Sequence, residues 1–471
     1  MGIYRPCDRL QQRPTACGSD CRFCGHSSRM KGLSDIPLLV GEVFVDFTLT
    51  APGTENKLRL GGVAHAARGF WALGVPFSAA VILPDYLVDS TRTYFEALGC
   101  VDVHVLGIVI GAPNVTVIVD ATEVADQEYD TLLRDGKIVR LSTTRLGGPE
   151  ADEILLFPGT YDLKAVCSIL PKEARLHIDV AYDVRAPVDI TGLPQAVETV
   201  LISTSSELFR SVHSDGIAGL VKAFSSSKPS TVILKENRGG ARLISASSGE
   251  VEALPAQLGT TVNSVGVGDV FAAAYVVHID KGSIEAGWRA TYASAAYSQT
   301  THPDLFRTYV RRDLKLSLDE MRELWGTFLP WERRQDLSIY LAAPDFAAAD
   351  RMAIDRALAS LQYHNFRVRR PVAENGELPP GSDAAALAKT YKADCDLLKQ
   401  CQLVFAVPTG RDPGTLVEIG LAIEAGIPVV VFDPAGENAN TMVMAGSAHY
   451  SGDLDSCLNA VFRLLGEGRP T

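Results

Sequence analysis

Long apolar runs are missing from this sequence. A membrane-spanning helix needs roughly 18 consecutive apolar residues, whereas the richest stretches, residues 36–47 and 426–432, have about the length of a strand. The first residues, MGIYRPCDRLQQRP, also lack the apolar segment of a secretory signal. We therefore expect a cytoplasmic protein without a membrane partner.

An excess of positive charge is missing as well. The 471 residues include 44 basic and 56 acidic side chains, which gives a formal net charge of −12. A general electrostatic attraction to nucleic acid or anionic lipid is therefore disfavoured. Small molecules become the expected partners.

Internal repeats and low-complexity tracts are absent too, and the composition is that of an ordinary globular protein. From about residue 37, apolar strands alternate with helical stretches, which is typical of βαβ units with a mainly parallel sheet covered on both faces. The pattern covers residues 37–325 and 337–465, and the string TFLPWERRQD between them indicates a linker. We predict an α/β protein with a leader (1–34), a first domain (35–326), a linker (327–336) and a smaller second domain (337–471).

Four of the nine cysteines crowd the leader: Cys7, Cys17, Cys21 and Cys24, followed by His26. Thiolate and imidazole ligands at such spacing are able to hold a tetrahedral Zn²⁺, which would staple a segment too short for its own core. The C-x3-C-x2-C spacing also resembles the iron–sulfur signature of radical S-adenosylmethionine enzymes. A leader with unligated thiols is the third alternative.

A glycine-rich turn opens an apolar helical stretch late in the first domain. Gly266, Val267, Gly268 and Asp269 stand directly before the run that begins at Phe271. Backbone N–H groups at such a helix start converge on an anion, and the helix dipole favours phosphate. The aspartate would take a proton from a hydroxyl that attacks a γ-phosphoryl group. Taken alone, the motif is equally compatible with a plain helix cap.

Further features occur in the order found in one family. A strand ends at Asp46, Gly61-Gly62 precedes a helical stretch, and S-S-E at 205–207 and KENRGGARLI follow before NSVGVGD. In this order the first domain resembles the ribokinase-like (PfkB) family of carbohydrate and nucleoside kinases, which implies an α/β/α fold, ATP and Mg²⁺. By this resemblance Asp269 is the base and Glu207 positions Mg²⁺ through water. Asp46 and Gly62 would bind substrate hydroxyls, and Gly266, Val267 and Gly268 would form the anion hole.

Three departures from the family pattern bear on substrate recognition. Asn263 stands where the family usually has an aspartate, His65-Ala66-Ala67 replaces the sugar-reading asparagine region, and Thr204 replaces another asparagine. The base position is intact. We therefore expect either a kinase with an altered substrate or a domain that only binds a nucleotide or nucleoside.

The second domain concentrates carboxylates where strands pass into helices. Asp394 and Asp396 lie on a helical stretch before one strand, and the block DPGTLVEIGLA places Asp412 and Glu418 after it. A carboxylate nucleophile with a protonated carboxyl group beside it suits cleavage of a glycosidic C–N bond, by the logic of retaining glycosidases. We expect Glu418 to be ionised by nearby N–H groups and a second carboxyl group to keep its proton. An Asp-Pro-Gly turn and a surface glutamate are the alternative interpretation.

These blocks, with the opening I-Y-L-A-x-P and the later N-T-M, resemble the nucleoside 2-deoxyribosyltransferase family from residue 339 to about 450. The resemblance implies a doubly wound, flavodoxin-like fold with Glu418 as nucleophile and Tyr340 orienting it. It also implies that Asp396 and Asp412 assist protonation and hold the base. Asn440 would bind the sugar, often from a neighbouring subunit, so we expect a homo-oligomer. Hydrolysis stays open beside base exchange.

Both resemblances concern nucleosides or their sugars. The leading hypothesis is a bifunctional enzyme that cleaves or transfers N-glycosidic bonds and phosphorylates a sugar or nucleoside. The alternative is a nucleotide-responsive sensor, in which the kinase-like domain only binds a ligand and regulates a nucleoside or nucleotide hydrolase.

Overall fold

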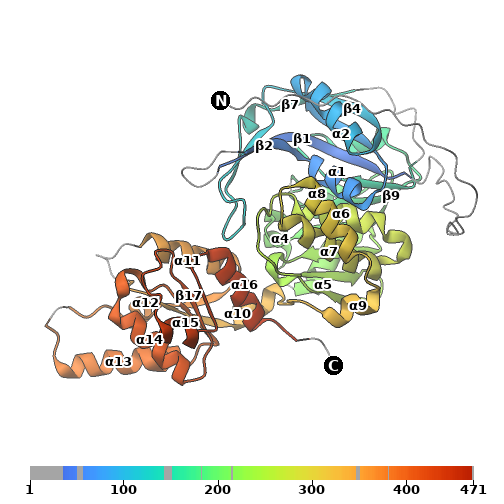
Figure 1. Ribbon diagram of the computed structural model, residues 1–471. Coiled ribbons are helices and arrows are strands. Elements are labelled where there is room, and N and C mark those ends of the chain that lie inside the picture. The colour runs from blue at the N-terminus through green and yellow to red at the C-terminus, as the bar shows by residue number, and fades with distance from the viewer. Residues whose placement is uncertain are drawn as a thin grey trace, which may run out of the picture.

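The computed structural model describes residues 36–49, 57–142, 151–181, 183–213, 216–345, 351–379 and 381–468. It has two α/β domains side by side, with the junction at α10 (Trp331–Asp336) and α16 (Leu454–Leu465) (Figure 1). The cysteine-bearing leader lies outside the described residues. Within the described ranges, no helix combines the length and the apolar character needed to cross a bilayer.

The first domain is built on a large sheet whose centre is parallel. Its strands are ordered β13-β12-β11-β10-β9-β8-β1-β3-β4-β7, and those from β11 to β4 pair in parallel. Parallel strands buried on both faces read as apolar runs, as in β3, where all eight residues are buried. The bounds are β1 (Leu38–Thr48), β3 (Phe77–Pro84), β4 (Cys100–Ile110), β7 (Ile138–Leu141), β8 (Glu153–Leu156), β9 (Arg175–Asp179), β10 (Ala196–Ser203), β11 (Thr231–Lys235), β12 (Ala241–Ser245) and β13 (Val251–Leu254).

Helices cover both faces of this sheet, as the sequence predicted. One face packs against α1 (Ala64–Leu73), α2 (Val88–Ala97), α6 (Val267–Val277), α7 (Ser283–Ser298), α8 (Pro303–Asp313) and α9 (Leu318–Leu324). The other packs against α3 (Leu163–Ile169), α4 (Glu207–Val212) and α5 (Gly216–Phe224). Short 3₁₀ turns are η2 (Asp85–Leu87), η3 (Arg134–Gly136), η4 (Pro187–Ile190), η6 (Ser225–Ser227), η7 (Asn237–Gly239) and η8 (Ile279–Lys281).

A second layer of strands grows from the end of β1. It comprises β2 (Lys57–Gly62), antiparallel to β1, and β5 (Val115–Ile118) with its partner β6 (Tyr129–Thr131). We call residues 119–128, which connect β5 and β6, the connecting loop. It reaches the second domain, because Val124 is buried in the same apolar cluster as Ile339 and Leu341.

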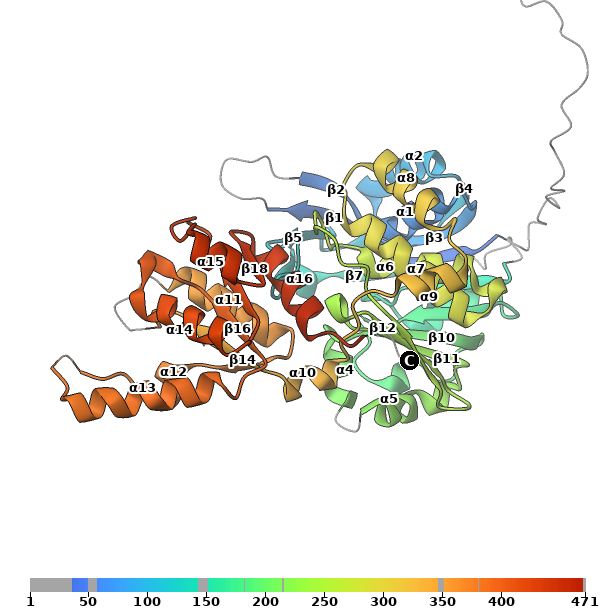
Figure 2. The same ribbon diagram turned by 60° about the horizontal axis from the view of Figure 1, so that its bottom comes forward.

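The second domain has five parallel strands in the order β15-β14-β16-β17-β18. This is the 2-1-3-4-5 order of flavodoxin-like folds, so the predicted doubly wound domain is confirmed. The strands are β14 (Ser338–Ala342), β15 (Arg367–Arg369), β16 (Leu403–Ala406), β17 (Val429–Phe432) and β18 (His449–Ser451). One face carries α11 (Met352–Tyr363) and α16, the other α13 (Ala384–Leu398), α14 (Pro413–Glu424) and α15 (Thr441–Gly446), while α12 (Pro371–Asn375) and η9 (Thr409–Arg411) lie in the connections. Figure 2 shows α13 projecting from the domain.

The predicted linker is a packed connection that includes α10. Arg334 is fully buried, donates to the backbone oxygens of Glu236 (2.6 Å) and Leu329 (3.1 Å), and stacks on the rings of Trp331 and Phe462. A charged side chain whose guanidinium is hydrogen-bonded and whose stem packs on aromatic rings is stable inside a junction. The charges in TFLPWERRQD therefore do not mark an exposed spacer.

Candidate functional site

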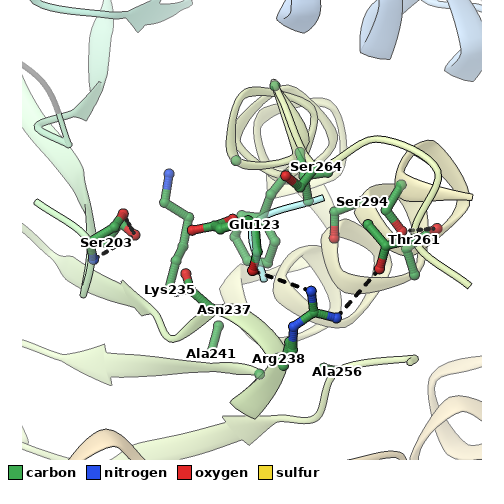
Figure 3. Close-up of a pocket in the computed structure, with 18 of the residues that line it drawn as sticks. Glu123, Ser203, Lys235, Asn237, Arg238, Ala241, Ala256, Thr261, Ser264 and Ser294 are labelled. Atoms are coloured by element: carbon green, nitrogen blue, oxygen red, sulfur yellow. Dashed lines mark hydrogen bonds between the residues drawn. The ribbon is translucent and has the colours of Figure 1, made fainter. Parts of the chain in front are cut away.

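The first domain contains a cavity of about 210 Å³ beside the start of α6 (Figure 3). Its walls come from the end of β11 and η7, from residues 256–261, from α7 and from the connecting loop. Lys235 and Ser203 lie on one side of the cavity in Figure 3, and Arg238 and Thr261 on the other. The second domain contributes His364 to the lining.

The predicted phosphate motif forms the start of α6 at this cavity. Gly266 is the N-cap with φ 85°, a left-handed conformation that favours glycine. A Cβ at Gly266 would also lie 2.2 Å from the ring of His65, and one at Gly268 would lie 3.0 Å from Nζ of Lys235. Two glycines therefore keep the helix start open to an anion, with a cation beside it.

Asp269 lies in the first turn of α6 and lines the cavity. Burial, assisted by the negative charge of Asp179, raises the pKa of Asp269 to about 7, although the charge of Lys235 acts in the opposite direction. Lys235 also donates from Nζ to Asp179 Oδ2 at 2.5 Å. A carboxyl group with a pKa near neutrality is able to take up and release a proton at physiological pH, which is the property of a general base.

Asp46, the predicted substrate-binding residue, is already engaged by side chains of this chain. It is 4% exposed, its Oδ2 accepts a hydrogen bond from His65 Nε2 at 2.8 Å, and Arg59 Nε lies at 3.6 Å. Burial alone would raise the pKa of Asp46, but His65 and Arg59 hold it below its usual value. Burial lowers the pKa of His65 to about 4, so the pair is a carboxylate with a neutral imidazole.

His65 is fixed from its other side as well. Its Nδ1 lies 2.8 Å from the hydroxyl of Tyr297 and 2.9 Å from NH1 of Arg68. Because the arginine is only a donor, Nδ1 accepts and the proton stays on Nε2, facing Asp46. The histidine that departs from the family pattern thus binds one of the two carboxylate oxygens of Asp46.

Two other predicted residues of the first domain lie away from the cavity lining. Gly62 has φ 60° at the end of β2, where a Cβ would lie 2.3 Å from the backbone oxygen of Glu42, so it serves the turn. Glu207 is the first residue of α4 and is exposed, two residues after Ser205, which does line the cavity.

A magnesium ion fits this site only with a nucleotide. Among the described residues, no cluster of three or more His, Cys, Asp or Glu side chains is arranged to hold a metal. Mg²⁺ in kinase sites is bound by one or two carboxylates, waters and substrate phosphates, and Asp179 and Asp269 offer carboxylates beside the helix start. The predicted zinc ligands lie outside the described residues.

In the second domain, Tyr340 and Glu418 meet where β14 and α14 come together. The buried Tyr340 hydroxyl donates to Glu418 Oε1 at 2.5 Å. Burial, together with the charges of Asp394 and Asp412, raises the pKa of Glu418 to about 7, and the bond from Tyr340 lowers it. The expectation of a strongly ionised Glu418 therefore gives way to a carboxyl group that is near half-ionisation at neutral pH.

The carboxylates around Glu418 divide into two roles. Asp412 caps α14, because its Oδ2 accepts from Thr415 N at 2.7 Å and from Thr415 Oγ1 at 2.9 Å. Asp394 is half-buried and interacts with both Glu418 and Tyr340, whereas Asp396 is exposed. The structure thus places Asp394, rather than the predicted Asp396, at the site.

Asn440 is the exposed N-cap of α15, and its side chain accepts from Met442 N at 2.9 Å. Two arginines at the end of β15 are held in ion pairs within the domain. Arg369 makes a bidentate pair with Glu374 (2.7 and 2.6 Å), and Arg370 donates from Nε to the buried Asp345 at 2.6 Å.

Comparison with known proteins gives a family match for this domain. Residues 339–452 match the family model for nucleoside 2-deoxyribosyltransferase. The resemblance read from the sequence is confirmed, and we call this part the deoxyribosyltransferase-like domain. No curated protein gives a significant match to the chain.

Solved structures similar to the remaining part of the chain are kinases. Ribokinase from Giardia lamblia has 14% identity over 60% of this chain and 99% of its own (TM-score 0.46). Ribokinase from Arabidopsis thaliana, complexed with ribose and ATP, has 14% identity over 60% and 100% (TM-score 0.43). A nucleoside kinase from Methanocaldococcus jannaschii, an archaeal member of the ribokinase family, has 11% identity over 60% and 100% (TM-score 0.41).

Sequence reasoning overlooked Lys235 and Asp179, and it named Asp394 without giving it a role. Lys235 stands inside the stretch KENRGGARLI, and Asp179 ends a buried apolar strand, a place where α/β proteins collect polar ligand-binding groups. The third, Asp394, precedes the buried Leu397 and Leu398 by three and four positions and therefore shares their helix face.

Proposed function

We propose that the deoxyribosyltransferase-like domain breaks the N-glycosidic bond of a nucleoside or deoxynucleoside, with Glu418 as nucleophile. The observation that supports this most is the pair of Tyr340 and Glu418 with Asp394 and Asp412 nearby. Such a pair supplies a carboxylate held in one orientation by a buried hydroxyl, as an attacking group requires.

In the proposed reaction, the Glu418 carboxylate forms a bond to the anomeric carbon while the bond from that carbon to the base nitrogen breaks. The electron pair leaves with the base, which takes a proton from a neighbouring acid or from water. The glycosyl ester is then attacked by a second base or by water. This step regenerates the Glu418 carboxylate and restores the proton to the donor.

The test is a product assay by mass spectrometry with deoxynucleosides and free bases. We expect base exchange or hydrolysis by the wild type and loss of both in Glu418→Gln. Glu424→Gln is the matched control, because Glu424 is exposed at the last position of the same helix. Wild type and Glu418→Gln that are equally inactive, or equally active, would contradict the proposal.

We further propose that the first domain binds ATP with its phosphates at the start of α6 and transfers the γ-phosphoryl group to a hydroxyl. Asp269 would accept the hydroxyl proton, and Lys235 would stabilise the charge on the transferred group. Mg²⁺, when bound with the nucleotide, supplies charge neutralisation. ATP consumption with a panel of sugars and nucleosides tests this, and Asp269→Asn should abolish it.

A second candidate function for this domain is nucleotide sensing without transfer. It is favoured by the network in which Asp46 Oδ2 is hydrogen-bonded to His65 and lies near Arg59, because part of the proposed substrate-binding carboxylate is already used within the chain. Tight ATP binding without turnover on any sugar or nucleoside would support the sensor, and Asp269-dependent turnover would exclude it.

We propose that the deoxyribosyltransferase-like domain forms a homo-oligomer. Large apolar side chains are exposed on the helices around Glu418: Leu387 (54%) and Tyr391 (59%) on α13, Val417 (55%) on α14, and Met442 (78%) and Met444 (47%) on α15. Exposed apolar side chains gathered on neighbouring helices favour association between subunits. Light scattering would give the mass, and Val417→Lys should lower it.

A further inference from the structure

One wall of the first domain's cavity is held by the second domain. Arg238 forms part of this wall (Figure 3), is 8% exposed, and donates from NH1 to Asp455 Oδ1 at 2.7 Å and to Asn459 Oδ1 at 2.8 Å. Both acceptors belong to α16. A residue of the proposed nucleotide pocket is therefore oriented by side chains more than 200 positions away in the chain.

The same face of α16 also holds the cavity loop at residues 258–261. Asp455 Oδ2 accepts from Thr261 N at 3.1 Å, Asn459 Nδ2 donates to Gly259 O at 3.0 Å, and Arg463 donates to Leu258 O at 2.9 Å. Positions 455, 459 and 463 are four residues apart and so form one stripe along the helix. The regular spacing indicates that this face of α16 forms a specific interface with the loop.

Arg238 also joins the connecting loop to this wall. Its NH2 donates to the backbone oxygens of Thr122 at 2.9 Å and Glu123 at 3.3 Å. The hydroxyl of Tyr363, in the second domain, donates to Glu123 Oε1 at 2.8 Å. The guanidinium group of Arg238 thus contacts both α16 and the connecting loop, and Tyr363 holds that loop through Glu123.

One donor of this guanidinium has no protein acceptor. Nε of Arg238 is buried and makes no hydrogen bond with any part of the chain that the structure describes. A buried N–H without a partner carries a free-energy cost unless a ligand or water accepts from it. Since Arg238 lines the cavity, a bound molecule is well placed to do so.

We propose that Arg238 binds the base or ribose end of the nucleotide, and that Asp455 and Asn459 of the second domain act as its positioning residues. The phosphates occupy the opposite end of the cavity, between the start of α6 and Lys235, so Arg238 meets the nucleoside part. The inference rests on the proposed binding of ATP in this cavity. It makes the deoxyribosyltransferase-like domain a structural component of the kinase-like pocket.

The test is titration calorimetry of the full chain with ATP and, separately, with inorganic tripolyphosphate, both with Mg²⁺. Arg238→Lys, Asp455→Asn and Asn459→Ala should each weaken ATP binding about tenfold, the loss expected for one hydrogen bond to a charged group, and leave tripolyphosphate binding unchanged. Asn459→Ala keeps the buried ion pair intact and decides the test if Asp455→Asn does not fold. The control is Glu332→Gln, which removes an ionic contact to Arg242 at the same junction but outside this cavity.

The outcomes separate this inference from the proposed function. If the wild type binds no ATP, both are wrong. If it binds ATP and the three variants bind it as tightly as Glu332→Gln, the inference alone is wrong. An equal loss of ATP and tripolyphosphate binding would show a merely structural role and also overturn it. If the wild type binds ATP but not tripolyphosphate, the test rests on ATP binding alone, and the three variants are compared with Glu332→Gln.

Discussion

Replacement of Glu418 by glutamine should inactivate the deoxyribosyltransferase-like domain and at the same time stabilise it at alkaline pH. Burial raises the pKa of Glu418 from an ordinary 4.5 to about 7. The folded state therefore retains a proton that the unfolded chain has released between these two values. Stability contributed by this group falls as the pH rises through that window and is lowest above about 7.

The size of the effect follows from the two pKa values. Ionisation of Glu418 should cost the folded wild type about 1 kcal/mol at about pH 5.5 and about 3 kcal/mol at about pH 8.5, by proton linkage. Glutamine does not ionise, and its amide oxygen still accepts the hydrogen bond from Tyr340. The stability advantage of Glu418→Gln over the wild type should therefore grow by about 2 kcal/mol between about pH 5.5 and 8.5.

Urea unfolding of both proteins at the two pH values, followed by circular dichroism, measures this difference. The other titrating groups are the same in both proteins. The pH dependence of the difference between their free energies of unfolding therefore reports the ionisation of Glu418. For Glu424→Gln, at an exposed position, the difference in free energy of unfolding from the wild type should not change with pH. A constant advantage for Glu418→Gln, or one that shrinks as the pH rises, would refute the assigned environment of Glu418.

Three further results are expected at this site. Tyr340→Phe removes the donor that lowers the pKa of Glu418, so the pH–rate profile should move to higher pH and the rate should fall about 10- to 100-fold, as for loss of a hydrogen bond to a charged group. Asp394→Asn removes a neighbouring negative charge and should move the same profile to lower pH. Asp412→Ala should lower the free energy of unfolding by about 1 kcal/mol through loss of the helix cap, and Asp412→Ser should restore most of it, as thermal denaturation can measure.

The sequence was sufficient for positions that local structure sets. Glu418 and Asp269 both follow glycine-containing turns that open helices. Each turn can be recognised from a short stretch of sequence. The parallel sheet of the second domain followed from the alternation of strands and helices, because parallel strands require helical crossovers. These features depend on neighbours within about one helix length.

Other features depend on contacts that no spacing reveals. The choice between Asp394 and Asp396 depends on the rotation of α13, since positions two apart on a helix point to nearly opposite sides. The contact of Arg238 with Asp455 joins residues 217 positions apart. The occupation of Asp46 by His65 required the geometry of α1 against β1, although the departure at His65 had already indicated altered substrate recognition.

The positions of the two sites bear on why the domains are joined in one chain. Successive residues of β14 point to opposite faces of the second sheet: Tyr340 packs with the α13 and α14 side, whereas Ile339 and Leu341 pack with α11, α16 and Val124 of the connecting loop. Glu418 and the first domain's cavity therefore lie on opposite sides of this sheet. A nucleoside released by the proposed reaction at Glu418 would leave on the side of the sheet away from the cavity, so we infer that fusion couples the sites through structure. The two neighbours of Tyr340 in the strand contact the junction core, so β14 is the element through which nucleotide binding would reach the proposed glycosidic site.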